Sequence, residues 1–107
     1  MSSAAEVVSM DLVRDALRLV IDPELGYNIV DLGLVYDVAV NGPDALITMT
    51  TTTRGCPATD YLQSGAYEAA VSVEGIESAE VVLTYDPPWT PQMMTPAAKE
   101  HFGIEDE

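Results

Sequence analysis

The sequence contains one cysteine, one histidine and four basic residues, against 18 aspartate and glutamate residues. A single cysteine excludes a disulfide within the chain, which is typical of proteins from a reducing compartment. The formal net charge of −14 opposes binding to nucleic-acid phosphates and to anionic membrane surfaces. We therefore expect neither nucleic acid nor a membrane as a partner. The acidic character serves solubility or favours basic protein partners.

Long apolar runs are also missing. No stretch approaches the roughly 20 apolar residues of a membrane helix, and Met1 to Val8 lacks the basic and apolar regions of a signal peptide. The cytoplasm is the expected compartment. A chain of 107 residues that is 48% hydrophobic suits one domain with its own core. We expect a flexible leader at residues 1–8, a single domain at residues 9–104 and an acidic tail at residues 105–107.

The spacing of apolar residues predicts an α/β (α+β) domain with the order helix, strand, strand, helix, strand, short helix. A turn at residues 41–44 should join the first two strands as an antiparallel hairpin. The helix before the third strand permits a parallel crossover, so we expect a mixed sheet packed against helices. The predicted elements span residues 10–22, 34–40, 45–53, 57–73, 77–86 and 95–103.

Strand alternation predicts which side chains share a face of the sheet. In the first strand, Tyr36, Val38 and Val40 should point one way and Val35 the other. The four threonines at residues 50–53 favour a strand and make its end polar on both faces.

The segment from Asp22 to Gly33 mixes carboxylates, glycines and apolar residues, and it predicts a long ordered loop. Such a loop is either functional or a packed connection. Asp22, Glu24 and Asp31 could bind a hard cation, but capping and loop hydrogen bonds are the more ordinary role for such carboxylates.

Cys56 stands where the polar strand end meets the second predicted helix. Free N–H groups and the positive end of a helix dipole favour a thiolate at such a position, and Arg54 adds positive charge nearby. The alternative is a buried cysteine that only fills space. There is no Cys-x-x-Cys and no His-x-x-x-His, and His101 is distant in sequence, so one chain offers neither a complete metal site nor an obvious catalytic base.

Trp89, Met93 and Met94 lie in a segment bounded by prolines. We favour the interpretation that they cover the core. The alternative is an apolar contact patch for a partner.

Three separated motifs carry a resemblance to a known family. The chain resembles the SufT/PaaD-like family of iron–sulfur assembly proteins, which includes the eukaryotic cytosolic iron–sulfur targeting factor. The motifs are Asp22-Pro23-Glu24 with Asn28–Val35, then Thr53-Arg54-Gly55-Cys56-Pro57, and finally Asp86–Pro91 with Met94-Thr95 and Phe102–Ile104.

The resemblance implies a fold similar to iron–sulfur scaffold domains and an accessory, non-enzymatic role in cluster assembly or in delivery to client apoproteins. It implies that Cys56 is the reactive cysteine and the metal ligand. The acidic loop residues Asp22, Glu24 and Asp31, and also Trp89 and Thr90, match its other motifs. Together with Thr53, Arg54 and Gly55, these residues are candidate loop and partner contacts.

One cysteine cannot supply the four ligands of an iron–sulfur cluster. A transient cluster shared between two protomers of a homodimer is one expectation, and a thiolate that binds together with outside ligands is another. The alternatives are a cysteine-independent adaptor that docks clients to the assembly machinery, or a PaaD-like factor for one oxygenase complex. The absence of zinc-ribbon cysteines weakens the PaaD-like alternative.

Overall fold

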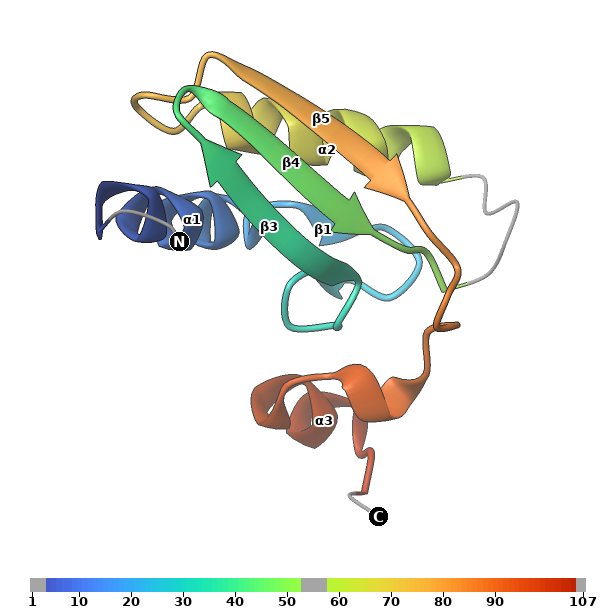
Figure 1. Ribbon diagram of the computed structural model, residues 1–107. Coiled ribbons are helices and arrows are strands. Elements are labelled where there is room, and N and C mark those ends of the chain that lie inside the picture. The colour runs from blue at the N-terminus through green and yellow to red at the C-terminus, as the bar shows by residue number, and fades with distance from the viewer. Residues whose placement is uncertain (1–3, 53–57, 106–107) are drawn as a thin grey trace.

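The computed structural model describes residues 4–52 and 58–105, with side chains from residue 9 onward. Nine elements follow one another along this part of the chain (Figure 1). They are α1 (Ala4–Leu17), β1 (Ile21–Asp22), β2 (Tyr27–Asn28), β3 (Val35–Asn41), β4 (Asp44–Met49), α2 (Thr59–Val71), β5 (Ser78–Leu83), the 3-10 helix η1 (Pro91–Met93) and α3 (Pro96–Phe102).

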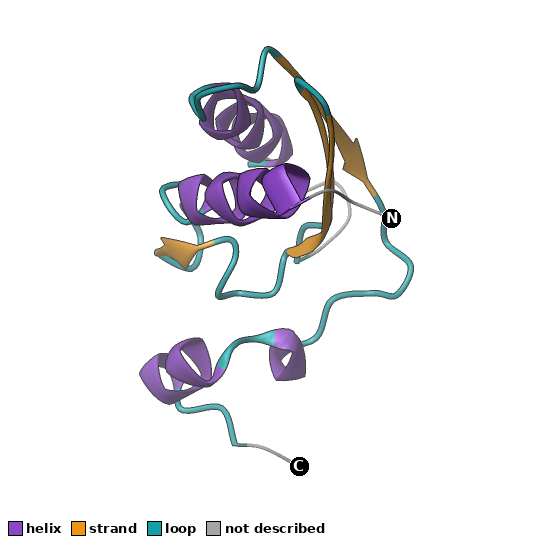
Figure 2. Cartoon of the chain, turned by 60° about the vertical axis from the view of Figure 1, so that its left-hand side comes forward, coloured by secondary structure: helices purple, strands orange, loops and turns teal. Residues whose placement is uncertain are grey.

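A three-stranded mixed sheet in the order β3-β4-β5 forms the centre of the fold. Strand β4 pairs antiparallel with β3 and parallel with β5. Asn41 pairs with Asp44, so only Gly42 and Pro43 lie in the hairpin turn. Helices α1 and α2 lie on the same face of the sheet (Figure 2). The predicted hairpin, parallel crossover and mixed sheet packed against helices are confirmed.

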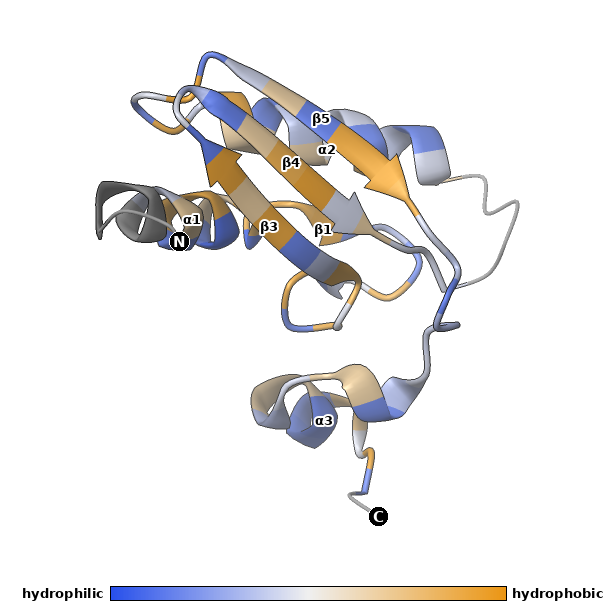
Figure 3. Ribbon diagram, in the orientation of Figure 1, coloured by the Kyte–Doolittle hydropathy of each residue, from blue (hydrophilic) through white to orange (hydrophobic). Residues whose placement is uncertain are grey.

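The core lies between that face and the two helices. Fully buried side chains come from α1 (Val13, Leu17), from α2 (Leu62, Ala66, Ala70) and from the sheet (Val38, Ile47, Met49). Hydrophobic residues follow one another along the strands (Figure 3), while exposed or partly exposed positions alternate with buried ones along β4. Each fully buried aliphatic side chain stabilises the fold by about 1.5–3 kcal/mol relative to exposure. The small residues of α2 allow it to lie close to its neighbours.

Both predicted boundaries of the first helix were wrong. Helix α1 begins at Ala4 instead of Met10 and ends at Leu17 instead of residue 22, because β1 begins at Ile21. Alanine and glutamate are strong helix formers, and neither glycine nor proline lies between Ala4 and Ser9, so the helix extends back to Ala4 and Ser9 lies inside it. Helix α2 begins at Thr59, with Ala58 as its N-cap residue, and the predicted start at Pro57 lies outside the described residues.

The second strand is shorter than predicted. Strand β4 ends at Met49, which pairs with Val35, the first residue of β3. Beyond this point one further bond joins the two segments, from the Thr50 N–H to the Leu34 carbonyl at 2.8 Å. The pairing between β3 and β4 therefore stops at Met49, because β3 begins at its partner Val35.

The predicted alternation fails at one place in β3. Val35 pairs with Met49 and Asp37 pairs with Thr48, so Tyr36 is an extra residue on β3. Such a bulge shifts the side chains on either side of it relative to each other. As a result Val35 is buried on the same side as Val38, where strict alternation would have placed them apart.

The last segment leaves the sheet after β5 and forms a separate small layer with η1 and α3 (Figure 1). Thr95 is the N-cap residue of α3 and its Oγ1 accepts from the Ala98 N–H at 3.4 Å. Gly103 ends the helix with φ of 70°. The short helix predicted from Thr95 to Gly103 is confirmed. Among residues 4–52 and 58–105, no helix has both the length and the apolar character needed to cross a membrane.

Candidate functional site

The predicted acidic loop is ordered, with the short pair β1–β2 inside it. Asp22 is only 1% exposed, and its Oδ1 accepts from the backbone N–H groups of Glu24 (2.7 Å) and Leu25 (3.1 Å). This is the local hydrogen bonding by which an aspartate fixes a turn. The geometry supports the capping role for Asp22, while Glu24 lies at the surface of the loop.

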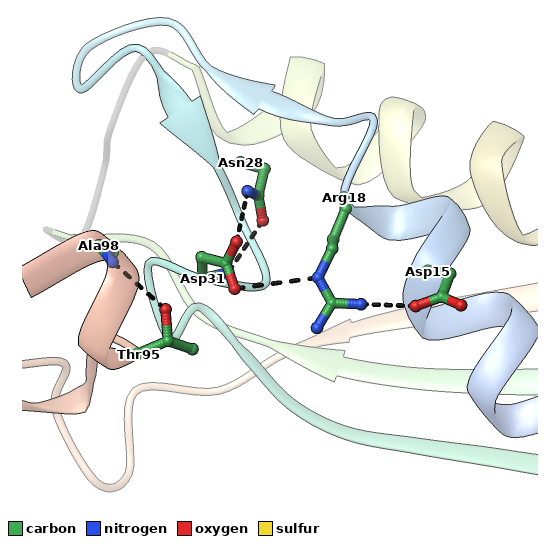
Figure 4. A network of polar contacts seen from close by, with 6 residues as sticks. All are labelled: Asp15, Arg18, Asn28, Asp31, Thr95 and Ala98. Atoms are coloured by element: carbon green, nitrogen blue, oxygen red, sulfur yellow. Dashed lines mark hydrogen bonds and ion pairs between the residues drawn. The ribbon is translucent and has the colours of Figure 1, made fainter. Parts of the chain in front are cut away.

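Asp31 belongs to a second polar network (Figure 4). Its Oδ2 accepts from Asn28 Nδ2 at 2.8 Å, and Asn28 Oδ1 accepts from the Asp31 N–H at 2.9 Å. The Arg18 guanidinium lies 3.8 Å from Asp31 and 2.6 Å from Asp15. These ion pairs are largely exposed and contribute at most about 1 kcal/mol. No cluster of three or more His, Cys, Asp or Glu side chains that could hold a metal ion occurs within the described residues.

Trp89 joins the last segment to the acidic loop. Its indole Nε1–H donates to the Leu32 carbonyl at 2.7 Å, and the ring packs against the core. Met94 is buried, while Thr90 caps the start of η1. This arrangement supports the interpretation that Trp89 and Met94 cover the core.

Two of the three family motifs therefore meet in space, at what we call the loop–tail junction: residues 28–35 against residues 86–95. Besides the Trp89 bond, the Thr95 N–H donates to the Asp31 carbonyl at 2.9 Å. The Tyr36 hydroxyl, next to the loop, donates to the Pro87 carbonyl at 2.7 Å. A hollow of about 550 Å³ opens between the two segments, lined by Val30, Gly33, Val35, Tyr36, Pro87 and Met93.

A group of hydroxyls lies beside this junction, and the sequence interpretation missed it. Thr50 and Thr51 are both buried, and Thr51 Oγ1 lies 2.9 Å from the Tyr85 hydroxyl. Four threonines in a row were the available signal, but they were interpreted only as strand formers that make the strand end polar on both faces. Thr50 and Thr51, which belong to this cluster of hydroxyl side chains, come shortly before residue 53 in the sequence.

Partial burial raises the pKa of Tyr36 above its ordinary value of 10.0, and a hydrogen bond with the Thr50 side chain offsets part of that rise. Above pH 10 the unfolded chain loses this proton while the folded chain keeps it, so stability is complete below pH 10 and falls as pH rises towards the folded-state pKa. We expect Tyr36→Phe to remove this part of the alkaline loss.

The measurement is urea unfolding at about pH 9 and about pH 11. Tyr36→Phe should also lose about 1 kcal/mol at both pH values, because the bond to Pro87 is gone. The matched control is Tyr61→Phe, whose ring is 60% exposed. An alkaline loss in Tyr36→Phe equal to that of the unmodified chain would contradict the assignment.

The predicted reactive residue Cys56 lies outside the described residues, as do its neighbours Thr53, Arg54, Gly55 and Pro57. The structure does describe where the chain resumes. Ala58 is the N-cap residue of α2: its carbonyl accepts the first helical hydrogen bond, from the Leu62 N–H at 2.9 Å, and its side chain provides no cap. The first-turn N–H groups of α2 therefore receive no acceptor from the side chain of their N-cap residue, two positions after Cys56 in the sequence.

The fold defines a small α/β domain with a mixed sheet, and comparisons with known proteins show its family. A family model described as iron–sulfur cluster assembly protein matches residues 10–83, and the chain belongs to this family. A crystal structure of a domain of unknown function from Bacillus anthracis superposes with a TM-score of 0.90 at 36% identity, covering 97% of this chain and all of that one.

The names of two similar proteins indicate the role of the family. The Fe-S protein maturation auxiliary factor YitW of Bacillus subtilis is 41% identical over 95 residues, which are 87% of this chain and 92% of that protein. SufT of Staphylococcus aureus, another such factor, is 39% identical over 87 residues, covering 80% and 99%. The resemblance to the SufT/PaaD-like family is confirmed, as is an accessory role in iron–sulfur assembly or delivery.

One further relative carries an enzyme's name. A protein of Escherichia coli, named as one component of a 1,2-phenylacetyl-CoA epoxidase, is 42% identical over 87 residues, which are 78% of this chain but 52% of that protein.

Proposed function

We propose that this protein is a cytoplasmic, non-enzymatic factor that binds an iron–sulfur cluster transiently through the Cys56 thiolate and passes it to client apoproteins. The proposal rests on two facts taken together, the family of the chain and the position of its cysteine. The chain belongs to an iron–sulfur assembly family, and its single thiol stands two residues before the N-cap of α2. The dipole at a helix N-terminus and its free N–H groups favour a thiolate, which is the form that binds iron.

The cluster is the cargo of this protein, and one chain cannot hold it alone. Four ligands are needed and the chain has one cysteine. We propose that two protomers share the cluster, or that the thiolate binds while the donor or recipient protein supplies the other ligands. Assembly proteins and client apoproteins are then the expected partners. The absence of a base near Cys56 in the sequence argues for carriage over catalysis.

The test is anaerobic reconstitution with iron and sulfide, comparing the unmodified protein with Cys56→Ser. We expect visible absorption and bound iron in the unmodified protein and at least a tenfold loss in Cys56→Ser, because serine does not replace a thiolate ligand for soft metals. Roughly one [2Fe–2S] cluster per two chains would identify a shared site.

Two results would overturn the proposal. One is equal cluster content in Cys56→Ser, and the other is no cluster in either protein. Because Cys56 is the only cysteine, no second thiol can compensate in the variant, so the comparison is direct.

A cysteine-independent adaptor is the second candidate function. It is favoured by one observation, the exposure of large apolar side chains between α1 and α2 on a chain of strongly acidic character. In that case Cys56→Ser would retain activity in cells.

A further inference from the structure

The most exposed large apolar side chains in the described part of the chain are Leu19, at 82%, and Tyr61, at 60%. They lie on different elements. Leu19 follows α1, and Tyr61 is in the first turn of α2. Both line one groove of about 380 Å³ between the end of α1 and the exposed side of α2, together with Val20, Ser64, Gly65, Glu68 and Ala69. We call this the α1–α2 groove.

The floor of the groove depends on Gly65. A Cβ at this position would lie 3.1 Å from Val20 Cγ1, so the missing side chain lets Val20 come up against the helix. Val20 itself is buried and belongs to the core. The groove therefore has an apolar floor that is continuous with the core, and its apolar walls are Leu19 and Tyr61. Contiguous apolar surface of this kind marks an interaction site more often than scattered exposed residues do.

The charge in the groove is acidic. Glu68 lies on the exposed side of α2, one turn after Ser64, and it is the one charged residue among the described residues that line the groove. None of the described basic residues Arg14, Arg18 and Lys99 lines the groove. The Arg18 guanidinium is engaged with Asp15 and Asp31 instead (Figure 4).

We propose that the α1–α2 groove docks a segment of a partner protein that presents an apolar side chain next to lysine or arginine. The apolar side chain would cover Leu19 and Tyr61, and the basic group would pair with Glu68. Charge complementarity selects this occupant over a second copy, because a two-fold contact at the groove would bring the Glu68 carboxylates of two chains of charge −14 together. A small polar ligand fits less well, because the lining offers few polar groups beyond Ser64 and Glu68.

This inference rests on the proposed function in one respect, that the partner is a client or an assembly protein. The groove and the cluster ligand are otherwise separate features, so each can fail alone. Leu19→Ser should leave reconstituted cluster content unchanged, and Cys56→Ser should leave docking unchanged.

The experiment uses a random peptide library displayed on phage and selected against the full chain. We expect enriched peptides to share a leucine, isoleucine, methionine or phenylalanine flanked by lysine or arginine. A synthetic copy of the most enriched peptide is then titrated against the full chain and its variants by fluorescence anisotropy. Leu19→Ser should weaken its binding about tenfold, as expected for an apolar anchor. Glu68→Gln should weaken it about two- to fivefold and reduce its salt dependence.

Two matched controls are available. Leu12→Ser changes another exposed leucine, 48% exposed on α1 and outside the groove, and Glu74→Gln removes an exposed carboxylate beyond the end of α2. Both should bind the peptide like the unmodified chain. All four variants change exposed residues and should keep the far-ultraviolet circular dichroism of the fold.

The proposal is overturned by any of three outcomes. Selection enriches no peptide or enriches acidic ones, Leu12→Ser weakens binding as much as Leu19→Ser, or sedimentation reveals a homodimer that Leu19→Ser dissociates. The third outcome would assign the groove to a second copy of the chain.

Discussion

Replacing Gly33 with alanine should lower the free energy of unfolding by about 2–4 kcal/mol, the largest loss we expect from adding one methyl group. Gly33 has φ of 80°, a backbone conformation that costs an L-residue about 1–2 kcal/mol. In addition, a Cβ at this position would lie 2.4 Å from the Met93 carbonyl oxygen and 2.8 Å from the Met93 carbonyl carbon. Because these are backbone atoms, the segment that carries Trp89 has to move away.

The loop–tail junction should open as a result. Gly33 follows Leu32, whose carbonyl accepts the Trp89 indole N–H, so a displaced segment also loses that bond. Trp89 is the only tryptophan, and its fluorescence reports the junction directly during urea unfolding. We expect a red-shifted emission in folded Gly33→Ala and a lower midpoint.

Gly26→Ala is the matched control for this prediction. Gly26 has a similar φ of 71°, but nothing lies within 4 Å of a Cβ placed there. It therefore carries the backbone strain without the collision, and we expect a loss of about 1 kcal/mol with unchanged tryptophan emission. Equal losses in the two variants would show that contact with Met93 contributes nothing.

Replacing Asp22 with alanine should cost about 2–3 kcal/mol. Its carboxylate is buried, and it accepts from two backbone N–H groups, those of Glu24 and Leu25. Alanine leaves both donors without this acceptor. The loss should spread to the β1–β2 pair, because Asp22 pairs with Tyr27 and its carbonyl accepts from the Gly26 N–H.

Asp22→Asn separates this structural role from a role in binding a cation. The amide oxygen can still accept from the two N–H groups, so Asn should lose less than half as much stability as Ala in the same urea titration. Equal losses would contradict the capping role. If both variants kept full stability but bound less of an added divalent cation, the cation alternative would replace it.

Local patterns in the sequence were enough to predict most of the fold. Helical spacing identified the helix that is α2, the turn residues Gly42 and Pro43 identified the hairpin, and a helix between two strands identified the parallel crossover. These predictions succeed because each depends on residues close together in the chain, whose periodicity the burial pattern repeats. The family resemblance added the role, and it also directed attention to Cys56, whose function stays a prediction.

Other features were decided only by the tertiary structure, because they depend on residues far apart in the chain. The bulge at Tyr36 arises from register against β4, and the Thr51 hydroxyl meets Tyr85, which lies 34 positions later, just after β5. Trp89 covers the core because its N–H reaches the Leu32 carbonyl, 57 positions earlier. The α1–α2 groove likewise exists only because packing brings two helices together. The sequence alone determined the six main helices and strands and where the single thiol stands among them, while long-range contacts decided the short elements β1, β2 and η1 and which motifs and exposed side chains share a surface.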